Sequence, residues 1–396
     1  MRIEKLKIKN FKVFRDIEVK NIPNMAVFLG MNGAGKSTFF DIFRFINDCL
    51  SKNVRAALAA RGGFTEVISR EQKGNIDFFI QFRPAEDEPL ITYELSIGLD
   101  GNNNPVIVKE IIRFRRGQRT GSPWKILDFS QGEGYAISGE INTYEDVKNA
   151  DKRSRQKLDS PDILAIKGLG QFKEFVAISA LRKLIEDWYV SDLHIDDTKQ
   201  RNDAGYSEIL SKTGDNLANA AKYIYDNHRE TFSIILQKMK DRIPGVSEIE
   251  ADVTQDGYIV LRFCDGKFKN PFSARFVSDG TIKMFAYLVM LSDPNHHSLL
   301  CVEEPENQLY PKLLPVLAEE FRLYSSMGGQ VFISTHSPEF LNAVELSELY
   351  CLIKEEGFTK IYRAANSQLI ASLYKEGDLL GYLWNQELLL EEVSKQ

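Results

Sequence analysis

The sequence has no long hydrophobic run: none of its 396 residues lies in an apolar stretch of about 18 residues, the length of a membrane-spanning helix. The first residues, Met-Arg-Ile-Glu-Lys-Leu, lack the apolar core of a signal peptide. Cysteine is also scarce, because the four cysteines are far apart and form no CxxC pair. These absences argue against a disulfide framework and a cysteine-ligated metal site. They predict a cytoplasmic protein with reduced thiols and no membrane span.

Positive charge is not in excess either. The chain has 50 Lys and Arg against 56 Asp and Glu, a net charge of −6, so the whole protein is not a polycation that coats nucleic acid. One basic cluster, residues 113–119, either contacts a nucleic-acid backbone or forms the solvated tip of a hairpin. Sustained heptads are missing, which excludes a long coiled-coil arm.

The clearest motif that is present is a glycine-rich loop between an apolar run, residues 25–29, and an apolar helical pattern, residues 39–46. Strand, glycine-rich turn and helix are the context of a phosphate-binding P-loop. Its backbone N–H groups and the helix N-terminus attract phosphate, the lysine reaches the β- and γ-phosphates, and the serine hydroxyl ligates Mg²⁺. The residues expected to bind nucleotide here are Gly30, Asn32, Gly33, Gly35, Lys36, Ser37 and Thr38.

Three later patterns carry further candidates. Ser278 and Gly280 lie at the expected start of a helix, where backbone amides either meet phosphate or form an ordinary N-cap. An apolar strand ends in Glu303 and Glu304, a Walker-B pattern whose first acid holds Mg²⁺ and whose second polarises water. Another buried strand ends in His336, on the sheet edge where ligands bind in open α/β sheets.

The order of these patterns predicts an α/β fold with three regions. Residues 1–119 would hold the P-loop and an antiparallel β meander, with strands near 76–82, 90–99 and 106–114. Residues 120–245 would form an insertion with helices near 172–189 and 216–243 in its later half. Its charged stretch, residues 148–157, is interpreted as a mobile or partner-facing loop or as a solvated helix face. Residues 246–396 would complete the sheet and end in a hairpin and a helical tail.

The ordered set of glycine-rich loop, Ser-Asp-Gly, Glu-Glu-Pro-Glu and Ser-Thr-His-Ser resembles the ATP-binding-cassette (ABC) class of P-loop ATPases. It is most similar to the branch with SMC proteins, RecF and the OLD-family ATPases. Residues 8–12 and 305–311 resemble short bacterial AAA-family ATPases of this branch. The resemblance covers residues 1–115 and 246–360, and reaches the insertion only at residues 214–217. It implies an ABC-type ATPase head with a mixed or parallel central sheet, an antiparallel meander and a mainly helical insertion.

The resemblance also implies ligands and roles. ATP and Mg²⁺ would be bound, with Mg²⁺ held by Ser37 and by Glu303, directly or through water. Glu303 stands where relatives usually have Asp. Glu304 would be the catalytic base, and His336 would contact the γ-phosphate. In relatives a glutamine links Mg²⁺ to the inserted lobe, and the candidates for it here are Gln171 and Gln72. Tyr310 stands where many relatives have a histidine, so no role is transferred to it.

Ser278 and Gly280 would act in trans, on ATP held by another protomer, which predicts a homodimer or higher oligomer closed by ATP. Only 60 residues follow His336, which we expect to be too few for the nuclease domain that OLD-type enzymes carry there. The expected function is an ATP-hydrolysing switch or clamp that controls a separate, nucleic-acid-directed effector, such as a nuclease, in bacterial antiphage defence or DNA repair. The alternatives are an ATPase subunit of a membrane transporter and a purely protein–protein switch.

Overall fold

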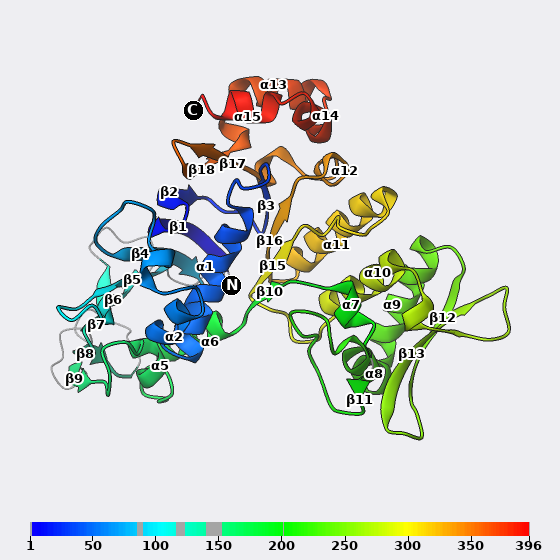
Figure 1. Cartoon of the computed structure of the whole chain (residues 1–396), viewed down its shortest axis with the longest axis horizontal. Coiled ribbons are helices and arrows are strands. Elements are labelled where there is room, and N and C mark those ends of the chain that lie inside the picture. The colour runs from blue at the N-terminus through cyan, green and yellow to red at the C-terminus, as the bar shows by residue number, and fades with distance from the viewer. Residues whose placement is uncertain (1, 85–89, 116–122, 140–152, 201, 396) are drawn as a thin grey trace.

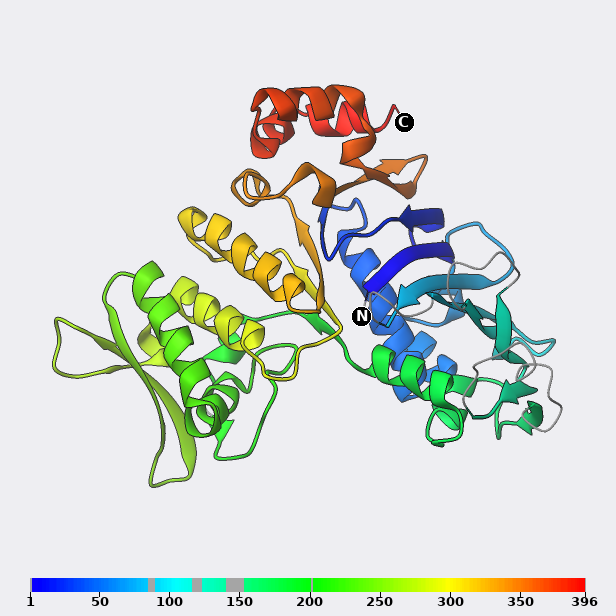
Figure 2. The same cartoon turned by 180° about the vertical axis from the view of Figure 1, so that it is seen from behind.

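A computed structural model of the chain describes residues 2–84, 90–115, 123–139, 153–200 and 202–395. A six-stranded sheet stands in the middle of the molecule, with one lobe on each side of it and the C-terminal helices above it (Figures 1 and 2). No helix in the described ranges is both long and apolar enough to cross a bilayer.

The central sheet has the strand order β10-β15-β16-β3-β17-β18. The first five strands are parallel to their neighbours, and only β18 is antiparallel. The strands are β3 (Met25–Leu29), β10 (Trp188–Ser191), β15 (Leu299–Glu303), β16 (Gln330–Thr335), β17 (Leu349–Glu355) and β18 (Phe358–Arg363). Its mixed, mainly parallel pairing is what the sequence predicts.

Both faces of this sheet are buried, which explains why β3 is a continuous apolar run. Ala26 and Phe28 face one hydrophobic core with helix α1 (Lys36–Ser51). Val27 and Leu29 face a second core with α10 (Asp279–Leu291) and α11 (Leu314–Ser326). The sheet therefore separates and supports the two lobes.

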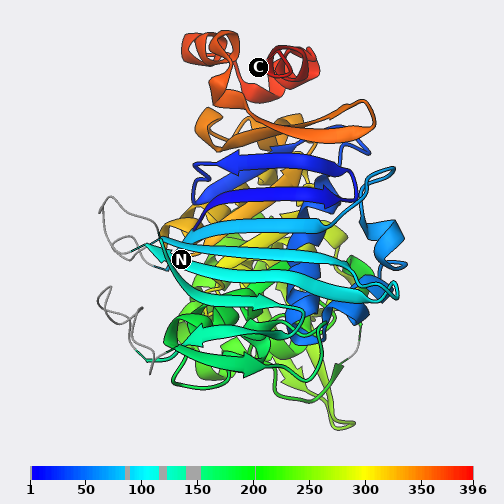
Figure 3. The ribbon, with the colours of Figure 1, turned by 90° about the vertical axis from the view of Figure 1, so that its left-hand side faces the viewer.

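The N-terminal lobe is built on an eight-stranded antiparallel sheet of order β2-β1-β4-β5-β6-β7-β8-β9, seen in Figure 3. The predicted meander is confirmed as the neighbouring strands β4, β5 and β6. The strands are β1 (Arg2–Phe11), β2 (Phe14–Lys20), β4 (Ile76–Arg83), β5 (Leu90–Leu99), β6 (Pro105–Arg115), β7 (Trp124–Ser130), β8 (Glu133–Ile137) and β9 (Arg153–Lys157). The sheet runs past residue 119, and the division of the chain at residues 119 and 245 stays a prediction.

Two charged segments lie partly on this sheet. Residues 113–115 end β6, and Arg113 forms an ion pair with Glu94 of β5, whereas residues 116–119 lie outside the described residues. Residues 153–157 form β9. The expectation of a loop or helix face was therefore wrong for these five residues, since β8 supplies the backbone partners of a strand. Residues 148–152 lie outside the described residues.

The second lobe joins helices to a small sheet formed by β12 and β13 with two short strands. The predicted helix over residues 216–243 is two helices, because His228 has a non-helical backbone between them. The two longer strands of this sheet, β12 and β13, pair antiparallel. The elements are α7 (Ile195–Thr198), β11 (Asn202–Asp203), α8 (Leu217–Asn227), α9 (Arg229–Arg242), β12 (Val246–Val253), β13 (Tyr258–Asp265), β14 (Phe272–Ser273) and the 3-10 helix η1 (Ala274–Phe276).

The C-terminal region follows the prediction of a hairpin, β17 and β18, and a helical end. Here α12 lies just after β16, and the last three helices form a layer that we call the C-terminal cap (Figure 1). The cap consists of α13 (Gln368–Glu376), α14 (Leu380–Asn385) and α15 (Leu388–Val393). The remaining elements are α2 (Val54–Ala59), α3 (Phe64–Val67), α5 (Ala165–Leu169), α6 (Val176–Glu186), α12 (Pro338–Leu341), η2 (Pro311–Leu313), η3 (Leu346–Glu348) and η4 (Ala364–Asn366).

The sheet topology brings the three strand-end motifs to one edge. Strand β16 pairs in parallel with β3 on one side and with β15 on the other, with Thr335 opposite Leu29 and Ser334 opposite Glu303. The carboxyl ends of all three strands therefore meet. The residues that follow them are the P-loop, Glu304 and His336.

Candidate functional site

The P-loop is held in a fixed shape by a distant strand. Gly35 precedes α1 with a φ of 98°, and a Cβ at this position would lie 2.9 Å from Val13 Cγ2 and 3.1 Å from Thr359 Oγ1. The Thr359 hydroxyl on β18 donates a hydrogen bond to the carbonyl oxygen of Ala34 at 2.9 Å. Glycine is required here both by the left-handed backbone and by the close approach of its neighbours.

The loop offers unpaired donors at a helix N-terminus. Within the described ranges, no acceptor is recorded for the backbone N–H groups of Gly33, Gly35 and Lys36. A Cβ at Gly33 would meet nothing within 4 Å, so the apex of the loop is open. Unpaired N–H groups at the start of a 16-residue helix fit an anion such as phosphate.

Lys36 is turned back into the loop. Its side chain is only 6% exposed, and Nζ donates to the Gly30 carbonyl at 2.8 Å and to the Met31 carbonyl at 3.5 Å. The same nitrogen lies 3.4 Å from Glu304 Oε1. The ammonium group therefore joins the P-loop to the loop that follows β15.

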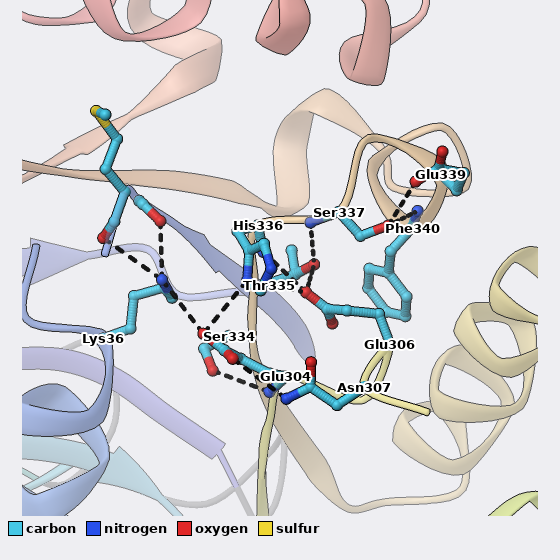
Figure 4. A network of polar contacts seen from close by, with 12 residues as sticks. Lys36, Glu304, Glu306, Asn307, Ser334, Thr335, His336, Ser337, Glu339 and Phe340 are labelled. Carbon is cyan, nitrogen blue, oxygen red and sulfur yellow. Dashed lines mark hydrogen bonds and ion pairs between the residues drawn. The ribbon is translucent and has the colours of Figure 1, made fainter. Parts of the chain in front are cut away.

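Glu304 is the centre of the polar network in Figure 4. Its backbone is left-handed, with a φ of 42°, and its N–H donates to the Ser334 carbonyl at 3.0 Å. His336 Nδ1 lies 3.3 Å from Oε1, and Asn307 donates to Oε2 at 3.3 Å. Burial by itself would raise the pKa of Glu304, but the Asn307 hydrogen bond and the charges of Lys36 and His336 outweigh it and lower this pKa. Glu304 is thus held ionised, as a proton acceptor must be.

Glu306 fixes the segment that carries His336. Its Oε1 accepts hydrogen bonds from the Thr335 hydroxyl at 2.8 Å and from the backbone N–H of His336 at 2.9 Å (Figure 4). The Glu306 side chain is 8% exposed, whereas that of His336 is 43% exposed. The histidine ring is therefore accessible while its backbone is anchored.

Glu303, the expected Mg²⁺ ligand, faces a cation of the chain itself. Arg44 on α1 places Nη1 2.8 Å from Glu303 Oε1, and its Nη2 lies 3.9 Å from Asp192. Ser37 is the second residue of α1 and lies two turns before Arg44, so α1 carries both the hydroxyl expected at the metal and the cation paired with Glu303. Both are oxygen ligands of the kind that Mg²⁺ prefers.

A cavity of about 480 Å³ adjoins the P-loop along α1. Ser37 and Thr38 line it together with cationic and acidic side chains. The negative charge of Asp41 is balanced there by two cations, which donate hydrogen bonds to it from Arg61 at 2.8 Å and from Lys12 at 2.6 Å. Burial opposes these bonds, but the two cations hold the pKa of Asp41 below its ordinary value. The other lining residues are Arg44, Asp48 and Ala60.

Ser278 is the N-cap of α10, as the sequence predicts, and its Oγ accepts from the Thr281 N–H at 3.4 Å. Helix α10 lies in the second lobe, away from the P-loop (Figure 1). Across the described part of the chain, no recorded contact joins Ser278 or Gly280 to residues 30–38. The trans role of this pair stays a prediction.

The first turns of α10 are attached to the loop after β15. Lys283, 4% exposed, donates to the carbonyl of Asn307 at 2.6 Å, and a Cβ at Gly280 would lie 3.0 Å from the Gln308 carbonyl. Burial lowers the pKa of Lys283 to about 8, although nearby carboxylates, Glu306 first among them, oppose this. Helix α10 therefore contacts, through Lys283, the residue whose side chain holds Glu304.

The two glutamine candidates are not brought to this network. Gln171 donates to the Lys167 carbonyl at 3.3 Å in the turn before α6, and the backbone of Gln72 bonds to Ser69. The choice between them stays open. Tyr310 is 61% exposed just before η2.

Sequence reasoning missed the supporting residues Arg44, Asn307 and Thr359, and gave Glu306 no role. Glu306 and Asn307 both had a local signal, since they lie in the run 305–311 that carries part of the resemblance.

Comparisons with known proteins bear on the family and the fold of the chain. A protein-family model described as "AAA domain, putative AbiEii toxin, Type IV TA system" matches residues 25–342. A search of curated proteins finds no match. Among solved structures, the chain is similar to an SMC head bound to the C-winged helix domain of ScpA. The two are 15% identical, the match covers 91% of this chain and 97% of that chain, and the TM-score is 0.52.

Two further SMC heads match with lower scores. The head from Thermotoga maritima is 15% identical over 92% of this chain and 99% of that chain, with a TM-score of 0.46. The head derived from Pyrococcus furiosus, with an extended coiled coil and the C-terminal domain of ScpA, is 12% identical over 95% and 99%, with a TM-score of 0.49. The first likeness confirms the expected fold class, an α/β fold with a mixed central sheet and antiparallel sheets.

Proposed function

Because this chain belongs to the AAA_21 family of ABC-type P-loop ATPases, we propose that it binds ATP with Mg²⁺ and hydrolyses ATP to ADP and phosphate. The observation that supports this most strongly is the meeting of Lys36 and His336 at one carboxylate oxygen of Glu304, at 3.4 and 3.3 Å. Lys36 lies more than 260 positions before both Glu304 and His336, and the fold brings all three together.

Each side chain has a distinct role in this proposal. The open N–H groups of the P-loop bind phosphate oxygens, and Lys36 exchanges its loop carbonyls for the β- and γ-phosphates. Glu304 accepts a proton from the attacking water, since its pKa is lowered and it is ionised at neutral pH. His336, with its exposed ring, donates a hydrogen bond to the γ-phosphate.

Ser37 and Glu303 would hold Mg²⁺, which supplies positive charge at the phosphate oxygens. The donor set fits by its chemistry, because both groups offer oxygen, the ligand atom that Mg²⁺ prefers. When Mg²⁺ binds, either Arg44 and the metal share the Glu303 carboxylate or the ion pair between Arg44 and Glu303 breaks.

Ser278 and Gly280 bind the ATP of a second protomer, so two chains complete two sites. The support is indirect: α10 starts with an exposed polar N-cap, and Lys283 connects this helix to the loop of Glu304. Closure on ATP would thereby reach the catalytic carboxylate of the same chain.

The closed dimer would control a separate, nucleic-acid-directed effector in bacterial defence. The family description, which names a toxin of a toxin–antitoxin system, supports a role in defence. The SMC head with the highest similarity reported above binds a separate protein, ScpA, and this supports a protein partner for the present chain.

The direct test is phosphate release from ATP by the purified chain. We expect hydrolysis that needs Mg²⁺, loss of nucleotide binding in Lys36→Ala, and retained binding without turnover in Glu304→Gln. Glu304→Asp is the matched control, because it keeps the charge and shortens the side chain. Hydrolysis by Glu304→Gln at the wild-type rate would show that another residue is the base.

A further inference from the structure

Both backbone polar groups of His336 are bound by side chains from other segments. Its N–H donates to Glu306 at 2.9 Å, and its carbonyl accepts a hydrogen bond from Trp384 Nε1 at 3.1 Å. Glu306 comes from the loop after β15, whereas Trp384 comes from α14 in the C-terminal cap. The peptide groups on either side of the histidine Cα are thus fixed from two directions.

These anchors matter because the ring itself is weakly confined. The His336 side chain is 43% exposed, yet Nδ1 lies 3.3 Å from Glu304 Oε1. A ring exposed to this extent is oriented by its contacts with Glu304 and Glu306 and by the backbone that carries it. A tilt of the peptide after His336 would move the ring away from Glu304.

Helix α14 is docked closely on α12, which starts two residues after His336. The Gly381 N–H donates to Asn342 Oδ1 at 2.9 Å, and a Cβ at Gly381 would lie 2.0 Å from the Pro338 carbonyl. Only glycine allows this approach. Trp384 and Gly381 therefore connect α12, α14 and His336 as one unit.

This unit lies partly outside the region that the family model matches, which ends at residue 342. All three cap helices are beyond that limit. The link between the cap and the strand-end histidine therefore joins the matched region to residues beyond it.

We propose that Trp384 is a positioning residue for His336 and that the C-terminal cap follows the state of the nucleotide through this contact. The inference rests on the proposed function, in which His336 meets the γ-phosphate. When the phosphate is bound, the ring is held by it and the 336–338 segment is stiff. When it leaves, that hold on the ring is lost while the backbone contacts with Glu306 and Trp384 remain, and α14 gains freedom with α12.

The first test compares Trp384→Phe with the wild type. Phenylalanine keeps most of the ring and loses the N–H donor. We expect kcat for ATP to fall about fivefold, as for the loss of one ordinary hydrogen bond to a positioned group, with KM for ATP nearly unchanged. Trp124→Phe is the matched control, because it makes the same change on β7 of the N-terminal sheet, and its kcat should equal that of the wild type.

Three results would overturn the inference. One is a wild-type kcat in Trp384→Phe. Another is a lower melting temperature with kcat retained, which would make Trp384 a packing residue only. The third is an equal fall in kcat and in the affinity for a non-hydrolysable ATP analogue, which would indicate general damage.

A second measurement needs no change at Trp384. Backbone hydrogen exchange of residues 380–385 is compared with and without ATP in Glu304→Gln. We expect exchange to slow when ATP is bound, and unchanged exchange would contradict the coupling. If the wild type does not hydrolyse ATP, the proposed function fails, whereas normal hydrolysis with an indifferent Trp384→Phe removes only this inference.

Discussion

Arg44 Nη1 lies 2.8 Å from Glu303 Oε1, so the acid expected at Mg²⁺ already has a cationic partner in this structure. The pair joins α1, which begins with the P-loop lysine, to the end of β15. A metal bound between Ser37 and Glu303 would compete with the guanidinium for the same carboxylate. Arg44 is therefore placed to set how strongly the site holds Mg²⁺.

Removal of this competitor should lower the Mg²⁺ requirement. We expect Arg44→Met to reduce the Mg²⁺ concentration for half-maximal ATP hydrolysis about fivefold, because a partly exposed ion pair contributes about 1 kcal/mol. Arg44→Lys keeps the cation and should stay near the wild-type value. A higher Mg²⁺ midpoint in Arg44→Met would show instead that the arginine holds Glu303 in place for the metal.

The stability of the N-terminal lobe should depend on pH through Glu110. This fully buried carboxylate on β6 accepts hydrogen bonds from the N–H groups of Ala165, at 2.5 Å, and Ile166, at 3.1 Å. Burial raises the pKa of Glu110 to about 7, although these bonds and one from Tyr93 oppose it.

The folded state thus holds this proton more tightly than the unfolded state, whose pKa is near 4.5. The stabilisation is complete below pH 4.5 and is lost as pH rises to about 7, a change of about 3 kcal/mol. We expect the urea midpoint of the wild type to fall over this range more than that of Glu110→Gln. Parallel midpoints in the two proteins would exclude Glu110 as the cause.

If the protein binds nucleic acid, its affinity for nucleic acid should depend strongly on the salt concentration. Under the proposed function, ATP-bound Glu304→Gln binds duplex DNA or RNA, with an affinity that falls about a hundredfold between 50 and 200 mM salt. A fluorescence anisotropy titration at several salt concentrations measures this, and Lys36→Ala with ATP provides the unbound control. Absence of binding at low salt would favour a switch that acts only on proteins.

The sequence predicts those parts of the fold that depend on neighbouring residues. β3, the P-loop and α1 were found because an apolar run, a glycine-rich turn and an apolar helix follow one another. The strand-end acids were found because two carboxylates follow an apolar run, and His336 because it ends another buried strand at the edge where parallel strands meet.

Contacts between residues that are far apart in the sequence could not be predicted from local sequence patterns. Thr359 supports Ala34 from 325 positions away, and no spacing or composition marks that pair. The same holds for Trp384 and His336, since the sequence of the C-terminal tail predicts a helix but no contact with His336. The break at His228 was missed because apolar periodicity continues on both sides without Gly or Pro.

The measurement that tests the central claim most directly is the mass of Glu304→Gln in solution, with and without ATP and Mg²⁺. If Ser278 and Gly280 complete the site of a second chain, ATP should convert monomers of 45.2 kDa to dimers, and Lys36→Ala should remain unchanged. Adding Ser278→Arg to Glu304→Gln should prevent the conversion while ATP still binds. A mass that ATP does not alter, in a variant that binds ATP, would contradict a composite site made by two copies of this chain.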